Sequence, residues 1–143
     1  MPYRFIDDVA SADAAVEAWG DTPETMMTAA ADALLALMVE YPACLSGVER
    51  RTISVEADTF DILLFRFLGE MVYIKDAEGL LLRVDSIDIT PAGGVYKLSA
   101  ELTGERADPQ KHSLYRDVKA VTLHRLSAAR DCSGWRATVV FDL

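Results

Sequence analysis

The sequence has little cysteine, no long apolar run and few basic residues, and each shortage excludes a class of protein. Cys44 and Cys132 are the only cysteines among 143 residues, too few for a disulfide framework, and neither belongs to a Cys-x-x-Cys zinc motif. The longest apolar stretch, residues 60–74, is broken by Arg66 and Glu70 and is too short to span a bilayer. The N-terminal segment has acids where a signal peptide needs an apolar core, so we expect a cytoplasmic protein with no membrane partner.

Basic residues are outnumbered, since 14 Lys and Arg stand against 23 Asp and Glu, a formal net charge of −9. A protein that binds nucleic acid by itself needs a basic surface to contact the phosphates. We therefore expect no direct nucleic-acid binding, although the charge leaves open a partner that holds nucleic acid, and an acidic surface suits a cation site. The chain is 51% hydrophobic and of ordinary domain length, which predicts one folded domain over residues 1–143.

Two segments carry the signals that open helices. Residues 21–24 (Asp-Thr-Pro-Glu) combine a capping residue, an early proline and an acid near the positive end of the helix dipole, and apolar residues then recur at helical spacing until Pro42. Residues 58–61 (Asp-Thr-Phe-Asp) resemble a capping box that opens a second helix, to about Tyr73. This second helix is apolar almost all round, so it should lie deep against a sheet.

The rest of the chain reads mostly as strands, because apolar and polar residues alternate or apolar residues run together. Gly-containing segments at 91–94 and 131–134 predict turns, and the second turn should join an antiparallel hairpin in which Asp142 pairs near residues 119–122. We expect an α+β fold of two layers, with two helices packed on one side of a mainly antiparallel sheet. The expected strands are residues 3–6, 13–18, 53–56, 80–89, 96–103, 118–126 and 135–141.

Ordinary enzyme signatures are absent from the sequence. There is no nucleophile elbow, phosphate-binding loop, dinucleotide fingerprint or His-Glu-x-x-His motif. Two histidines are present, His112 in a predicted loop and His124 inside a predicted strand, where a packed or hydrogen-bonded histidine is the commoner case. No spacing of serine, histidine and acid singles out a nucleophile.

Carboxylates stand at two unusual positions. Asp13 lies among small residues that leave its side chain uncrowded, and Asp142 is the penultimate residue, directly after a buried-looking strand. With the terminal carboxylate of Leu143, Asp142 makes an oxygen-rich start to a hard-cation site; the alternative is that both acids are simply solvated. Lys119 should lie beside Asp142 across the hairpin, where a plain cross-strand ion pair is the simpler interpretation.

Blocks along the whole chain resemble the archease family, in the order in which that family has them. The sharpest is Asp-Val-Lys-Ala-Val-Thr-Leu-His at residues 117–124, followed by Gly-Trp-Arg-Ala at 134–137 and Phe-Asp-Leu at 141–143. Weaker blocks lie at residues 3–6, 13–22, 29–39 and 76–81.

The resemblance implies a protein cofactor and not an enzyme. Its partner would be an RNA-splicing ligase, which joins RNA ends bearing a 2′,3′-cyclic phosphate or 3′-phosphate to a 5′-hydroxyl. The implied role is to promote guanylylation of the ligase's active-site histidine and so to support multiple turnover. The implied cofactor is a divalent cation (Mg, Mn or Ca) held by Asp13 and Asp142 with Leu143 nearby, and Lys119 and His124 are further functional candidates within the family's motif.

One departure from the family pattern concerns the first of these acids. Many archeases have His-Thr-Ala-Asp where this chain has Ala10, Ser11, Ala12 and Asp13, so one candidate ligand is missing, and Asp7 or Asp8 is the alternative.

Two other functions remain open. A chaperone-like binding module would need an exposed apolar patch, and a small metal-dependent hydrolase would need a base or nucleophile beside the two acids.

Overall fold

A computed structural model describes residues 2–6 and 12–143 of the chain. These residues form two α-helices, α1 (Pro23–Met38) and α2 (Phe60–Glu78), and a short 3-10 turn at Pro42–Cys44. The strands are β1 (Tyr3–Ile6), β2 (Asp13–Gly20), β3 (Glu49–Ala57), β4 (Leu80–Ala92), β5 (Val95–Arg106), β6 (Ala120–Val121), β7 (Ser127–Asp131) and β8 (Gly134–Asp142). Within the described residues, no helix combines the length and the hydropathy that a membrane span requires.

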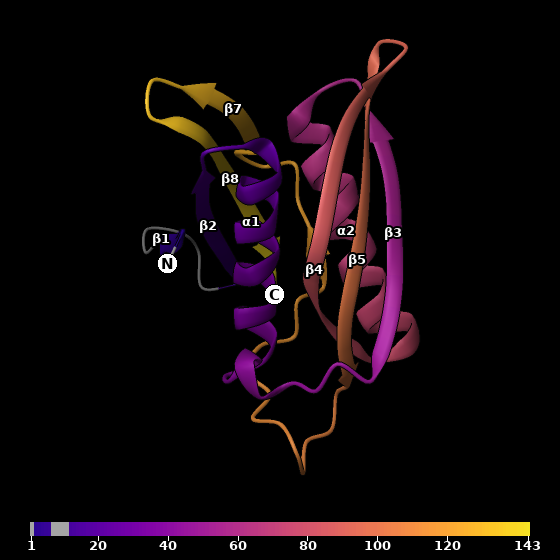
Figure 1. The fold of residues 1–143 in the computed structure, drawn as a ribbon. Helices are drawn as coiled ribbons and strands as arrows, with labels where there is room; N and C mark the ends of the chain where they lie inside the picture. The colour runs from indigo at the N-terminus through magenta and orange to yellow at the C-terminus, as the bar shows by residue number, and fades with distance from the viewer. Residues whose placement is uncertain (1, 7–11) are drawn as a thin grey trace.

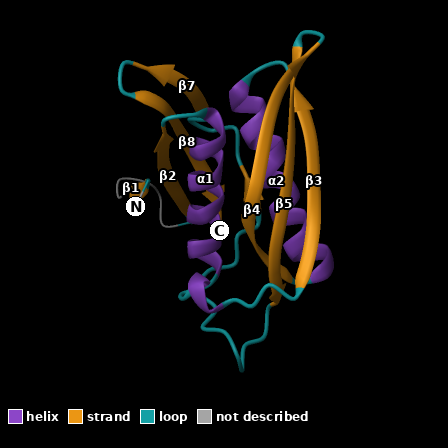
Figure 2. Ribbon diagram, viewed as in Figure 1, coloured by secondary structure: helices purple, strands orange, loops and turns teal. Residues whose placement is uncertain are grey.

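The strands divide between two antiparallel sheets. One has the order β1-β2-β8-β6, with β7 also paired to β8, and the other has the order β3-β5-β4. Each helix contacts strands of both sheets: α1 packs on β2 and β8 and on β4, and α2 packs on β3, β4 and β5 and on β6 and β7 (Figures 1 and 2). The expected α+β class is therefore confirmed, but the expectation of a single sheet was wrong. Helices that are apolar on most sides need a sheet on either side to bury them.

The first helix begins where the sequence signals place it and ends at Met38, four residues before Pro42. The Thr22 side chain accepts a hydrogen bond from the main-chain N–H of Thr25, and the Thr25 hydroxyl accepts one from the N–H of Thr22, which closes a capping box. Ten of the 16 residues are buried, including the methionines and leucines that recur at helical spacing. The C-terminal end leads through Val39 toward the turn at Pro42.

The second helix is longer than expected, since it continues past Tyr73 to Glu78. Ile74 is still buried in this last part, and Gly79 then ends the helix in the left-handed conformation with φ of 69°, donating its N–H to the carbonyl of Lys75. At the start, Thr59 occupies the cap position, but its hydroxyl donates to the Asp61 carboxylate and accepts no main-chain N–H of the helix, so the predicted capping box does not form. The helix depends on packing more than on its cap.

The predicted strand over residues 118–126 is the other correction. Only Ala120–Val121 forms a strand, β6, and pairing with β8 resumes at Ser127 in β7. The chain advances seven residues from Ala120 to Ser127 while β8 advances four, from Asp142 to Thr138. The surplus is taken up in a turn where Arg125 has a φ of 57°, a conformation that interrupts a strand.

Candidate functional site

Asp13 and Asp142 lie directly opposite each other on the paired strands β2 and β8. The next pair along is joined by a hydrogen bond from the Leu143 N–H to the Ala12 carbonyl, at 2.9 Å. Hydrogen-bonded and non-hydrogen-bonded pairs alternate in an antiparallel ladder, so Asp13 and Asp142 form the closer, non-hydrogen-bonded kind, with Cα atoms about 4.5 Å apart. Both side chains are half-buried and point to the same face of the sheet.

That face is the one turned away from the helices. Along β2, Val16 packs into the core between the sheets and Asp13 lies on the other side of the pleat. Along β8, Phe141 is fully buried in the core and its neighbour Asp142 faces outward in the same way. The apolar alternation that anchors both strands therefore also fixes the direction of both carboxylates.

Two like charges directly opposite on a ladder repel each other, and a divalent cation between them would remove the repulsion. The donor set is carboxylate oxygen with main-chain carbonyls nearby, which suits Mg²⁺, Mn²⁺ or Ca²⁺ with water completing the shell. Among residues 2–6 and 12–143, no group of three or more His, Cys, Asp and Glu side chains gathers to hold a metal. The residues fit a cation held by two carboxylates and waters.

The segment that precedes β6 is tied to the same place. The Lys119 N–H donates to the Asp142 carbonyl at 2.8 Å, and Ala120 lies opposite Asp142 on the other side of β8. The pairing expected of Asp142 with residues 119–122 is thus present, but it runs through the main chain. Among the ion pairs of the described residues, none joins the exposed Lys119 side chain to Asp142.

The remaining candidates do not join the acid pair within the described structure. His124 is exposed and lies in the turn between β6 and β7, not in a strand as expected. Asp7, Asp8 and Ala10 lie outside the described residues.

Lys75, near the end of α2, fixes the approach to this site and was not singled out from the sequence. Its ammonium group donates to the Asp117 carboxylate and to the Val118 carbonyl, both at 2.8 Å, and pairs with Asp76 at 2.7 Å. Burial works to lower the pKa of Lys75, but the hydrogen bonds to Asp117 and Asp76 outweigh it and raise the pKa. The lysine therefore holds residues 117–118, which directly precede the Lys119 N–H that donates to the Asp142 carbonyl.

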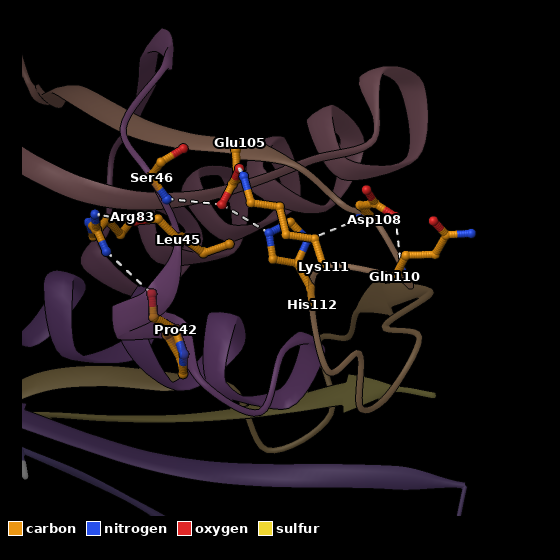
Figure 3. Close-up of polar contacts among 9 residues, drawn as sticks. All are labelled: Pro42, Leu45, Ser46, Arg83, Glu105, Asp108, Gln110, Lys111 and His112. Atoms are coloured by element: carbon orange, nitrogen blue, oxygen red, sulfur yellow. Dashed lines mark hydrogen bonds and ion pairs between the residues drawn. The ribbon is translucent and has the colours of Figure 1, made fainter.

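A second polar cluster, around the buried Glu105 on β5, was also missed (Figure 3). Its carboxylate accepts hydrogen bonds from Lys111 at 2.6 Å, from His112 at 2.9 Å and from the main-chain N–H of Ser46 at 3.0 Å. The Nδ1 atom of His112 accepts from the N–H of Asp108, so Nε2 carries the proton donated to Glu105. Lys111 and His112 hold the pKa of Glu105 far below its usual range.

This cluster explains His112 as a structural residue. Strand alternation puts Glu105 on the polar face of β5 with Thr103, and both are buried because residues 45–46 and 111–112 cover that end of the strand. The sequence near Glu105 does not predict that these distant residues bury it. The one signal is that a charged residue continues an apolar strand.

Comparison with known proteins identifies the class of protein to which this fold belongs. The model of the Archease protein family (MTH1598/TM1083) matches residues 3–143. The protein archease of Pyrococcus abyssi is 34% identical over 134 residues, covering 93% of this chain and 94% of that protein. The protein archease of Methanopyrus kandleri is 32% identical over 145 residues and covers all of both chains.

Solved structures agree with this match. The solution structure of Methanobacterium thermoautotrophicum protein 1598 superposes with a TM-score of 0.86 at 26% identity, over 99% of each chain. The crystal structure of a Thermotoga maritima archease, described as a possible chaperone, superposes with a TM-score of 0.65 at 20% identity over 98% of each chain, which supports the fold alone. The chain belongs to the archease family, as its sequence blocks indicated.

Proposed function

We propose that this protein holds a divalent cation between Asp13 and Asp142 and uses that site to activate an RNA-splicing ligase. In this role it promotes guanylylation of the ligase's active-site histidine, so that the ligase turns over repeatedly in joining 2′,3′-cyclic-phosphate or 3′-phosphate RNA ends to 5′-hydroxyl ends. The observation that carries the proposal is the direct opposition of the two carboxylates across β2 and β8. Membership of the archease family supports the choice of partner.

The chain's own part is to hold and orient the acids. Core packing of Val16 and Phe141 fixes the two strands, and the pleat then directs both carboxylates outward, where a partner can reach them. A cation bound there would supply positive charge for phosphate oxygens in the ligase site. The protein is then an accessory to the catalyst, and its acidic surface, with a net charge of −9, favours approach to a basic RNA-binding partner.

The test is formation of ligase–GMP from GTP by the RNA ligase of the same organism, with and without this protein at fixed free Mn²⁺. Asp13→Asn and Asp142→Asn should each lose stimulation while remaining folded, because neither side chain is part of the core. Asp88→Asn is the matched control, since Asp88 is an exposed acid on β4 of the other sheet. Wild-type stimulation by both site variants would remove the acid pair from the mechanism.

A chaperone-like binding module is the second candidate, favoured by exposed large apolar residues such as Tyr73, Tyr115 and Leu123, which are 65%, 62% and 62% exposed. This function predicts that the protein suppresses aggregation of the ligase during heating, independently of divalent cations. If wild-type protein protects the ligase from aggregation but leaves its rate of guanylylation unchanged, the chaperone function replaces the activator.

A further inference from the structure

A groove runs along the solvent-facing side of α1, between β1 and β4. It consists of two cavities of about 530 and 550 Å³, and Pro2 and Asp32 line both. One cavity lies against β4, with Ile87 in its wall, and the other lies against β1, with Tyr3 and Phe5. Asp32 thus lies where the two cavities adjoin.

The lining of the groove is acidic as well as apolar. Glu24, Asp32 and Glu40 reach it from the helix side and Asp85 from β4. Glu24 and Asp32 are eight residues apart on α1, which is about 12 Å along the helix, and Glu40 follows just beyond the end of α1 at Met38. Together with Asp85 they make the lining acidic from one end of the groove to the other.

Arg83 is the one basic side chain among the described lining residues, and its guanidinium is already engaged. It donates to the main-chain carbonyls of Pro42, at 3.3 Å, and Leu45, at 2.9 Å. The arginine therefore fixes the loop after α1 and does not neutralise Asp32. The groove keeps an excess of negative charge.

Asp32 stands beside an aromatic pair. Tyr3 and Phe5 meet edge to face with ring centroids 5.8 Å apart, and Phe5 is 43% exposed. Partial burial raises the pKa of Asp32, and burial together with the nearby Asp32 charge raises the pKa of Tyr3. A cation placed here would compensate the Asp32 charge, and its aliphatic stem would cover the exposed rings.

We propose that this groove docks a basic segment of a partner protein, with a Lys or Arg side chain laid against Tyr3 and Phe5 and its charge at Asp32. Because an extended chain rises about 3.3 Å per residue, basic residues four positions apart would match the spacing of Glu24 and Asp32 along α1. The groove is on the helix-facing side of β1, whereas Asp13 and Asp142 face the other way. The inference therefore does not rest on the cation site or on the ligase.

The experiment is a titration of the isotopically labelled full chain with a synthetic Ser/Thr peptide that carries lysine at every fourth position. Amide chemical shifts are followed in ¹H–¹⁵N spectra, and the same peptide with glutamine for lysine is the ligand control. We expect shifts to concentrate in β1, along residues 24–40 and at 83–87. Shifts spread over the whole acidic surface, or no binding by wild type, would overturn the proposal.

Variants test the role of the central acid. Asp32→Asn should weaken the lysine peptide about fivefold, as the loss of one partly desolvated ion pair predicts. Glu70→Gln removes the same charge from an exposed position on α2 and should leave affinity nearly unchanged. Ala36→Arg, which adds bulk and a cation within the groove, should abolish binding, and unperturbed shifts elsewhere show that the fold is intact. Equal weakening by Asp32→Asn and Glu70→Gln would reduce the effect to net charge and refute the groove.

Discussion

Without a cation, repulsion between Asp13 and Asp142 should lower the stability of the protein. A variant that lacks one of the two acids should therefore be more stable than wild type. The Cβ atoms of residues directly opposite on such a ladder lie about 5 Å apart, and two unit charges at that distance in water repel by about 0.8 kcal/mol. Asp142→Asn in EDTA should therefore raise the free energy of unfolding by about that amount, which is a rise of about 3 °C in the unfolding midpoint for a chain of this size. Most substitutions at an ordered strand end do the reverse.

Added cation should invert the order of the two proteins. A ligand at about 100 times its Kd stabilises the folded state by about 2.7 kcal/mol, so wild type should gain about 10 °C at that concentration of Mg²⁺, Mn²⁺ or Ca²⁺. Asp142→Asn should gain little, because one carboxylate remains of the two that face the site. Asp13→Asn should behave in the same way, and the double variant should be no worse at binding than either single variant.

The assay is thermal unfolding by circular dichroism in EDTA and then across a titration of each cation at constant ionic strength. Asp88→Asn should keep the full cation-dependent rise, since it lies on the other sheet. The reasoning fails if wild type shows no cation dependence, or if Asp142→Asn is less stable than wild type in EDTA. The first result removes the site, and the second shows that Asp142 stabilises the strand end in some other way.

Three further outcomes follow from other parts of the fold. The pKa of Glu105 is held below its ordinary 4.5, so as the pH falls this carboxylate is protonated in the unfolded chain before it is protonated in the folded one. The free energy of unfolding in urea should therefore decrease as the pH is lowered below about 5, and Glu105→Gln should show a smaller decrease. Gly104→Ala should lower the free energy of unfolding by about 3 kcal/mol in urea titrations, because its Cβ would collide with the main-chain oxygen of Leu81. Lys75→Met should cost about 1–3 kcal/mol in the same assay and should speed hydrogen exchange around residues 117–118, because the carbonyl of the buried Val118 loses its donor.

Local sequence signals predicted the elements well where the signal and the physical cause are both local. The cap at Thr22 and the glycines of the β4–β5 hairpin are of this kind: Gly93 and Gly94 adopt φ of 61° and 86°, as a tight turn of two residues requires. The strand predicted over residues 118–126 was wrong because what interrupts it is not local. Apolar and polar residues do alternate there, but the register with β8 changes between β6 and β7. That change depends on both segments, and the chain takes it up in a turn at Arg125.

The number of sheets could not be derived from periodicity. Apolar residues on most sides of a helix predict that the helix is buried, but they do not indicate whether one sheet or two bury it. Glu105 could not be found for a related reason, since its cover comes from residues 45–46 and 111–112, far away in sequence. Asp13 and Asp142 are a different case. Each was conspicuous by its own neighbours, but their opposition depends on the pairing of β2 with β8 across more than a hundred residues, which only the family resemblance suggested. The register of β2 on β8 holds the two like charges opposite each other, and their repulsion lowers stability unless a cation lies between them. For this reason the pair, and not either acid alone, supports a cation site.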